Sequence, residues 1–212
     1  MDIKNNKIKS NSASRVDFVV INNMVEKDSR ILDIGCDDGT LLSMLIDSKS
    51  VDGRGIEISS SKVNKCLAKG LSVVQGDADS DLVGYPNESF DYVVLSQTIQ
   101  SMLDPYSTLS ELLRVGKKAI VSIPNFGYWR VRTYLSIFGK MPVTPSLPQT
   151  WYNTKNIHLC TIKDFLELCE MLDFKIEQAV ALDRKGKQIS FAKSLWAANL
   201  IGEQAVFLLS KK

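Results

Sequence analysis

The sequence predicts an α/β protein with a seven-stranded, mostly parallel sheet and helices on both faces. An apolar run over residues 30–34 leads into a tight acidic turn, and a second short apolar run ends on Glu57 about twenty residues later, the spacing of a βαβ unit. Residues 90–97 form a continuous apolar stretch, which is typical of a central strand covered on both faces. These observations favour a doubly wound sheet with its ligand site at the carboxyl ends of the strands.

The remaining elements alternate along the chain. A helix is expected before the first strand, because Val16, Val20 and Met24 recur at helical spacing. Another helix begins at Pro105, a residue favoured in a first helical turn, and a later one takes Thr161 as its N-cap. The predicted strands cover residues 30–34, 53–57, 71–76, 90–97, 118–123, 174–182 and 204–209. The predicted helices cover residues 16–25, 59–69, 105–115, 126–138 and 161–172.

Two segments interrupt this alternation. Residues 139–160 hold three prolines together with Trp151 and Tyr152, and a loop of that length in a compact domain is usually functional or disordered. Its aromatic content argues against disorder, which leaves a packed surface loop, a lid or a docking surface as interpretations. Residues 183–202 carry a basic start and then an amphipathic pattern, for which packing on the core or contact with another protein is expected. We predict a disordered tail over residues 1–14 and a single domain over 15–212, with the lid or docking insertion at about 139–160.

Composition excludes several classes of protein. The chain has 212 residues, 44% of them apolar, and a net charge of +2, so the clustered basic footprint of a nucleic-acid binder is not expected. No apolar stretch reaches the length of a membrane span, and residues 1–14 lack the apolar core of a signal peptide. The four cysteines show no CxxC spacing, which predicts free thiols in the cytoplasm and no metal site.

The acidic turn narrows the choice of ligand. A dinucleotide fingerprint would place glycines at 35, 37 and 40, whereas this chain has Gly35, Asp37 and Thr40, with its second glycine at Gly39. Dinucleotide sites hold a pyrophosphate at a helix N-terminus, and Asp37 with its acidic neighbour Asp38 would repel it. S-adenosylmethionine (SAM) carries a sulfonium and an ammonium group and no phosphate, so it fits the turn best.

Four short runs together resemble the motif series of class I SAM-dependent methyltransferases: DIGCDDG at 33–39, GIE at 55–57, QGDAD at 75–79 and FDYVVLSQ at 90–97. The resemblance implies a Rossmann-like methyltransferase fold that binds SAM or S-adenosylhomocysteine (SAH). It also implies that Asp33, Gly35 and Gly39 shape the methionine end of the cofactor, that Glu57 holds the ribose hydroxyls, and that Asp77 faces the adenine amine. The adjoining candidate contacts are Cys36, Asp37, Ile58, Ala78, Ser96 and Gln97.

The C-terminal half carries a more specific resemblance. Residues 95–100, 114–127, 139–144 and 151–161 are together similar to the MetW family. Membership would imply a role in methionine biosynthesis, as a partner of a MetX-type homoserine O-acyltransferase. One departure from the family pattern is Asp37, which stands where glycine is usual and whose side chain is expected to crowd the amino-acid end of the cofactor.

Two functions remain open from the sequence. The chain is either a SAM- or SAH-binding accessory or regulatory partner of the acyltransferase, or an active SAM-dependent methyltransferase with a small-molecule acceptor. No GxSxG nucleophile elbow is present, which argues against its being the acyltransferase itself. The single histidine, His158, is the candidate general base, because its ordinary pKa suits proton transfer near neutral pH. The turn at Ser96 and Gln97 lacks the Asn/Asp-Pro-Pro-aromatic pattern of enzymes that methylate DNA or amide nitrogen.

Overall fold

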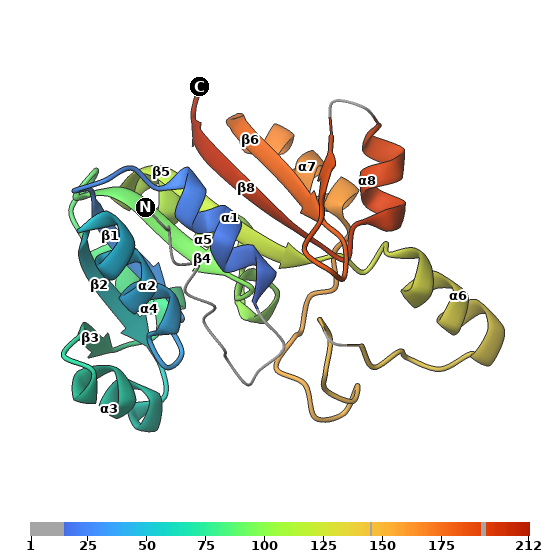
Figure 1. Cartoon of the computed structure of the whole chain (residues 1–212), viewed down its shortest axis with the longest axis horizontal. Coiled ribbons are helices and arrows are strands. Elements are labelled where there is room, and N and C mark those ends of the chain that lie inside the picture. Colours follow the sequence, from blue (N-terminus) through green and yellow to red (C-terminus); the bar gives the residue numbers. More distant parts are fainter. Residues whose placement is uncertain (1–14, 145, 192–193) are drawn as a thin grey trace, which may run out of the picture.

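The computed structural model describes residues 15–144, 146–191 and 194–212, and its centre is an eight-stranded sheet (Figure 1). The strands lie in the order β3-β2-β1-β4-β5-β8-β6-β7. The first five pair in parallel, while β8 runs antiparallel to both β5 and β6. The strands are β1 Arg30–Ile34, β2 Asp52–Glu57, β3 Ser72–Gln75, β4 Phe90–Ser96, β5 Gly116–Pro124, β6 Phe174–Leu182, β7 Gln188–Ser190 and β8 Gln204–Lys211.

The expected α/β fold with a mostly parallel sheet is confirmed, but the expected count of seven strands is wrong. The eighth, β7, is three residues long and pairs antiparallel with the end of β6. A tight turn makes this hairpin possible, because Gly186 adopts a positive φ of 80° and the Asp183 side chain accepts hydrogen bonds from the backbone N–H groups of Lys185 and Lys187. So short a strand carries no periodic signal, and its residues were included in the amphipathic segment 183–202.

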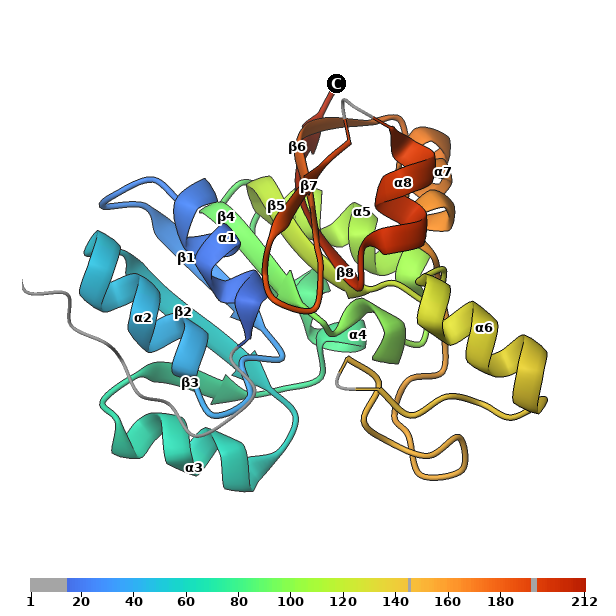
Figure 2. The same cartoon turned by 45° about the vertical axis from the view of Figure 1, so that its right-hand side comes forward.

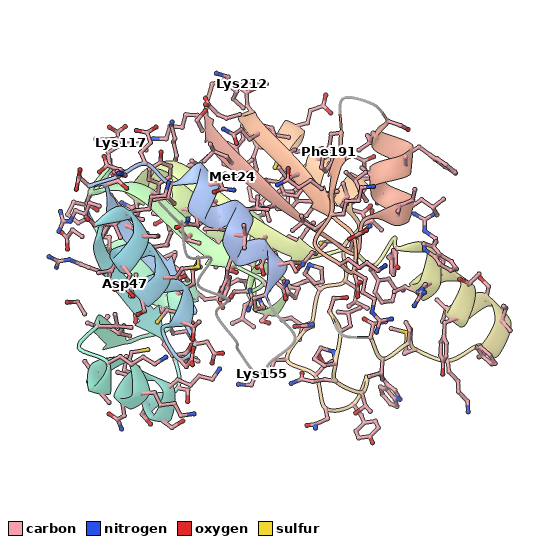
Figure 3. All side chains as sticks on the ribbon, in the orientation of Figure 1. Met24, Asp47, Lys117, Lys155, Phe191 and Lys212 are labelled. Atoms are coloured by element: carbon pink, nitrogen blue, oxygen red, sulfur yellow. The ribbon has the colours of Figure 1, made fainter. Side chains whose placement is uncertain are left out.

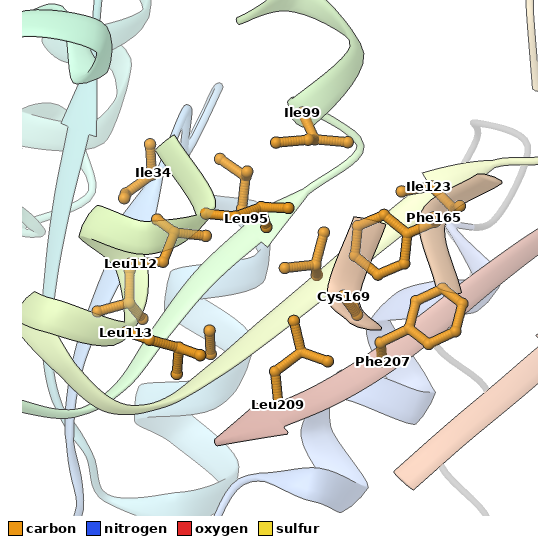
Figure 4. Close-up of a cluster of buried hydrophobic side chains, with 14 of the residues drawn as sticks. Ile34, Leu95, Ile99, Leu112, Leu113, Ile123, Phe165, Cys169, Phe207 and Leu209 are labelled. Atoms are coloured by element: carbon orange, nitrogen blue, oxygen red, sulfur yellow. The ribbon is translucent and has the colours of Figure 1, made fainter. Parts of the chain in front are cut away.

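Helices cover both faces of the sheet. On one face α1 and α2 pack against apolar side chains of β1, β4, β5 and β8. On the other face α5 and α7 enclose the larger core, which extends from Leu112 on α5 to the paired rings of Phe165 and Phe207 (Figure 4). The helices are α1 Val16–Met24, α2 Thr40–Lys49, α3 Ser60–Ala68, α4 Ala78–Asp81, α5 Pro105–Val115, α6 Trp129–Phe138, α7 Ile162–Met171 and α8 Leu195–Ile201, with 3-10 turns η1 Leu82–Gly84 and η2 Ile99–Ser101.

Capping residues explain where two of these helices begin. Thr161 and Asp164 form a reciprocal capping box at α7, as the N-cap expectation required. Asp104 accepts hydrogen bonds from the backbone N–H groups of Tyr106 and Ser107 at the start of α5, whose first residue is Pro105. Both helices then turn an apolar face onto the sheet, so local sequence signals and burial agree.

One helix lies apart from this core. Figures 1 and 2 show α6 and the chain that follows it extending away from the sheet. Of the ten residues in α6, only Val131 is buried. Residues 139–160 that follow contain no helix or strand among those the structure describes, apart from an isolated bridge between Thr144 and Leu147. The predicted tail over residues 1–14 lies outside the described residues.

Candidate functional site at the carboxyl ends of the strands

The sheet register gathers most of the predicted site residues at one edge. Ile34 pairs with Ile56 on one side and with Leu95 on the other, so the chain leaves β1, β2 and β4 at the same level. This edge includes the point where the strand order reverses between β1 and β4, the usual ligand position in open α/β sheets. We call the following group the strand-end site: Asp33, residues 35–39, Glu57, Ile58, Asp77, Ala78, Ser96 and Gln97.

The turn after β1 depends on backbone conformations that few residues adopt. Gly35, Asp37 and Gly39 all have positive φ, at 68°, 53° and 74°, and aspartate tolerates this region better than most residues. The N–H groups of Gly35 and Cys36 both donate to the carbonyl of Ile56, at 2.8 and 3.2 Å. Cys36 itself is buried against Gly55, and burial raises the pKa of its thiol, so Cys36 is a packing residue with an unreactive sulfur.

Replacing Gly39 with alanine is expected to lower the free energy of unfolding by about 1–3 kcal/mol. A Cβ at Gly39 would lie 2.3 Å from Leu71 Cδ1 and 3.0 Å from Cys66 Sγ. Gly70→Ala is the matched control, because Gly70 has a similar φ of 76° but nothing within 4 Å of its Cβ position. Urea denaturation of both variants separates crowding from backbone strain, and equal losses would show that crowding at Gly39 is not what requires glycine.

Glu57 connects the turn to β2. Its carboxylate is buried and accepts hydrogen bonds from the backbone N–H groups of Asp37, at 3.1 Å, and Ser59, at 2.9 Å. A carboxylate offers about four lone-pair positions, so two N–H donors leave capacity for two hydroxyl groups. The side chain is therefore fixed in place and still able to accept from a diol.

Lys62 on α3 and Lys69, the residue that follows this helix, pair with the acidic residues of the turn. Lys62 Nζ lies 2.8 Å from Asp37 Oδ1, and Lys69 Nζ lies 3.2 Å from Asp38 Oδ2. The Asp37 carboxylate is thus held by α3, and its hydrogen bond raises the pKa of Lys62. The two acids are adjacent in the sequence, but in the folded protein each faces a cation. The turn is consequently less repulsive toward anions than its composition suggests.

Asp33 is the most unusual group of the site. Its side chain is only 1% exposed, and Oδ2 has no hydrogen-bond partner among the described residues. Burial raises the pKa of this carboxyl to about 7, opposed by the positive charge of Arg15 and assisted by the negative charges of Glu57 and Asp37. A buried acceptor without a donor is costly, and strongly shifted groups of this kind cluster at functional sites.

A buried polar network that the sequence reasoning missed lies beside Asp33. Asp17, on α1, is fully buried and accepts hydrogen bonds from Arg15 Nε and Nη2, at 3.0 and 2.8 Å. Its Oδ2 also accepts from the hydroxyl groups of Ser96 and Ser122, at 3.0 and 2.9 Å. The available signal was an aspartate on the apolar face of the first helix, four residues before Ile21. The network ties α1 to the carboxyl end of β4.

The remaining candidates lie at the same edge but differ in orientation. Asp77 is exposed and accepts from the N–H of Asp79 as the N-cap of α4, while Ala78 behind it is buried. Ile58 follows Glu57 and is largely exposed, an apolar surface beside the polar site. The amide group of Gln97 donates to Gln204, so this side chain is engaged with β8.

His158 reaches the neighbourhood of β4 through backbone contacts. The N–H groups of Ile157 and His158 both donate to the carbonyl of Gln100, at 2.9 and 3.0 Å. Ser101 and Asn156 add a side-chain hydrogen bond of 3.3 Å. The segment 139–160 is therefore anchored on η2, just after the carboxyl end of β4. The side chain of His158 is exposed.

The residues present fit the cofactor that the sequence suggested. A buried, unpartnered carboxylate at Asp33 suits a cationic group, and Glu57 retains acceptor capacity for a ribose diol. Glycine at 35 and 39 permits the positive φ values of the turn and the close packing of Thr98 and Leu71 against it. A hollow of about 490 Å³ elsewhere on the sheet is lined by Arg30, Arg54, Tyr85 and Phe90, among others. It borders the amino ends of β1 and β4, so it is not part of this site.

Two further findings bear on function. None of the helices in the part of the chain that the structure describes combines the length and hydropathy needed to cross a membrane. Within the same residues, no group of three or more His, Cys, Asp or Glu side chains is arranged to hold a metal ion.

Comparison with known proteins agrees with this geometry. A family model described as methionine biosynthesis protein MetW matches residues 15–209. A bifunctional methionine biosynthesis protein MetXA/MetW from Rhodopirellula baltica is 30% identical over 185 residues. That match covers 83% of this chain but only 30% of the relative, so the chain spans less than a third of the protein it matches.

Solved structures share the fold at low identity. A SAM-dependent methyltransferase from Thermotoga maritima, described as a possible histamine N-methyltransferase, aligns with a TM-score of 0.64 and 18% identity, covering 94% of this chain and 91% of its own. The [4+2]-cyclase SpnF aligns with a TM-score of 0.63 and 18% identity, covering 94% and 81%. A likeness at this level establishes the Rossmann-like methyltransferase fold alone, and the cyclase illustrates that one fold hosts different chemistries.

Proposed function

The chain belongs to the MetW family of methionine biosynthesis proteins, and from this membership we propose that it is a SAM- or SAH-binding accessory partner of a MetX-type homoserine O-acyltransferase. In this role the strand-end site binds the nucleoside ligand, and the segment 139–160 contributes to contact with the acyltransferase. The fused relative supports the pairing, because joining two modules in one polypeptide keeps them at high effective concentration.

The observation that carries this proposal is the orientation of the segment 139–160. Its end is fixed to η2 beside the strand-end site by the two hydrogen bonds to Gln100. Its aromatic side chains nevertheless point outward, with Trp151 73% and Tyr152 74% exposed. A lid closing over a reacting substrate would bury such side chains, whereas a docking surface presents them to a partner.

The strand-end site supports a ligand role for SAM or SAH. Asp33 supplies an unpartnered buried carboxylate for a cationic group, and Glu57 supplies fixed acceptors for the ribose. The exposed Ile58 offers an apolar surface for the adenine ring. Bound SAM would supply an activated methyl group. Because SAM is also the end product of methionine metabolism, it suits the role of a signal as well.

A second candidate function is methyl transfer to a small molecule. The observation in its favour is His158, which is exposed and held next to the carboxyl end of β4 through Gln100, where an acceptor could lie. A histidine there could accept the proton that some acceptors must lose. Transfer of labelled methyl from SAM to a metabolite of a cell extract, abolished in Glu57→Ala and reduced in His158→Gln, would favour this function.

Binding to the acyltransferase and the effect on its activity test the proposed accessory role. We expect the homoserine O-acyltransferase from the same organism to co-elute with this chain in size-exclusion chromatography and to acylate homoserine faster in its presence. Two separate peaks at micromolar concentration, with unchanged acylation rates, would contradict an accessory role.

A further inference from the structure

The segment formed by α6 and residues 139–144 and 146–160, which we call the arm, exposes many large apolar side chains. Ile137 is 71% exposed, and Figure 3 shows side chains projecting from α6 into the surroundings. The exposed apolar residues of the arm are Trp129, Tyr134, Leu135, Ile137, Phe138, Met141, Val143, Trp151, Tyr152, Ile157 and Leu159. Many exposed apolar side chains on one segment are typical of an interaction site.

The short length of α6 also indicates that the arm is an interaction site. A helix of ten residues is marginal by itself in water and normally depends on tertiary packing. In α6 that packing comes chiefly from Val131, with Arg132 Nε adding a hydrogen bond to the carbonyl of Gly127. Further contacts with a partner would supply the missing packing.

The positive charge of the arm indicates which kind of partner surface it fits. Residues 112–163 contain no aspartate or glutamate, and the arm carries Arg130, Arg132, Lys140 and Lys155. The Arg130 guanidinium lies over the Trp129 ring, 5.3 Å from its centre, so charge and apolar surface are interleaved. Electrostatic complementarity then calls for an apolar surface rimmed by carboxylates.

A small hollow in the arm offers a place for an anchoring side chain. It has a volume of about 120 Å³, room for about four waters. Its lining includes Phe126, Met141, Leu147, Trp151 and Leu159. Buried aromatic or aliphatic anchors in such hollows carry much of the energy of an interface.

We propose that the arm is the docking surface for the homoserine O-acyltransferase, through an apolar patch with an acidic rim on that enzyme. This inference rests on the proposed function, and the fused relative supports the choice of partner. A second copy of this chain fits less well. In a two-fold symmetric contact each arm would face its own basic residues, and no acid of the arm could offset them.

Binding of the purified acyltransferase to arm variants tests the inference. Ile137→Asp and Tyr152→Asp should each raise the Kd at least tenfold, because each places a carboxylate in the apolar surface and beside an acidic rim. Met171→Asp on α7 and Val83→Asp in η1 are matched controls, since both side chains are as exposed as those of the arm. Their Kd should stay within twofold of the wild type. Unchanged circular dichroism and SAM affinity would confirm that the variants fold.

These binding experiments distinguish a failure of the arm as docking surface from a failure of the proposed accessory function. If the wild-type chain binds the acyltransferase and the arm variants bind equally well, the arm is not the docking surface, although the accessory role stands. If the wild type does not bind at all, the proposed function fails and the inference loses its partner. Arm-dependent binding to vesicles of phosphatidylglycerol and phosphatidylcholine, without acyltransferase binding, would instead identify an interfacial membrane surface. Arm-dependent dimers of the chain alone would identify a contact between copies.

Discussion

Replacing Asp33 with asparagine is expected to stabilise the protein at alkaline pH and to weaken SAM binding. In the folded protein burial raises the pKa of Asp33 from 3.8 to about 7. The folded state therefore holds a proton that the unfolded chain has lost, and stability decreases as pH rises from 3.8 to about 7. Asparagine has the same shape and no charge to bury, so it avoids this loss.

The size of the change in unfolding free energy follows from the shift in the pKa of Asp33. A change of about three pKa units corresponds to about 4 kcal/mol as an upper bound, and relaxation of the buried site reduces it. The difference in unfolding free energy, variant minus wild type, should grow by about 2–4 kcal/mol between pH 4 and pH 8. Urea denaturation at both pH values measures it. Asp47→Asn, at an exposed position of α2, is the control and should show no such growth.

SAM binding is also expected to depend on the ionised form of Asp33. A cationic ligand favours the ionised carboxylate, so SAM affinity of the wild type should increase as pH rises through 7, and Asp33→Asn should bind at least tenfold more weakly at pH 8. A variant that gains stability without losing affinity would show that Asp33 is a buried structural group with no part in binding.

Asp17→Ala is expected to destabilise the protein by about 2–4 kcal/mol. The substitution leaves Arg15 and the hydroxyl groups of Ser96 and Ser122 without their shared acceptor. Breaking a buried ion pair typically costs about 3–5 kcal/mol. The lower range applies here because the Arg15 side chain is 38% exposed and can turn to solvent. Chemical denaturation measures the loss, and hydrogen exchange should show that α1 opens more often.

A double-mutant cycle isolates the network from the rest of α1. Asp17→Ala combined with Ser122→Ala should cost less than the sum of the two single changes, because both remove the same hydrogen bond. Full additivity would mean that Asp17 stabilises α1 independently of the strand ends.

The sequence predicted most of the fold because local signals and burial agree along the chain. Continuous apolar runs located the central strands, and Pro105 and Thr161 located two helix starts. The expected helix over 126–138 begins later, at Trp129, because the Asn125 side chain accepts the N–H groups of Gly127 and Ile162 and holds the preceding residues in a turn. The hairpin strand β7 was missed because three residues are too few for a periodic pattern.

The site was predictable where it depends on strand order and unpredictable where it depends on packing. The positions of Asp33, Glu57 and Ser96 follow from parallel strands ending at one edge. The pairing of Lys62 with Asp37, and the hydrogen bonds from Ser96 and Ser122 to Asp17, join side chains that meet only after helices pack on the sheet. Period and spacing along the chain do not encode such contacts.

Calorimetric titration of the purified chain with SAM, and separately with SAH, measures whether the strand-end site binds these ligands. We expect SAM and SAH each to bind one site with micromolar affinity at pH 8, and Glu57→Gln to weaken the binding of both. The absence of heat and of any thermal shift with either ligand, in folded samples of the chain and of its mixture with the acyltransferase, would contradict a SAM site at the carboxyl ends of β1, β2 and β4.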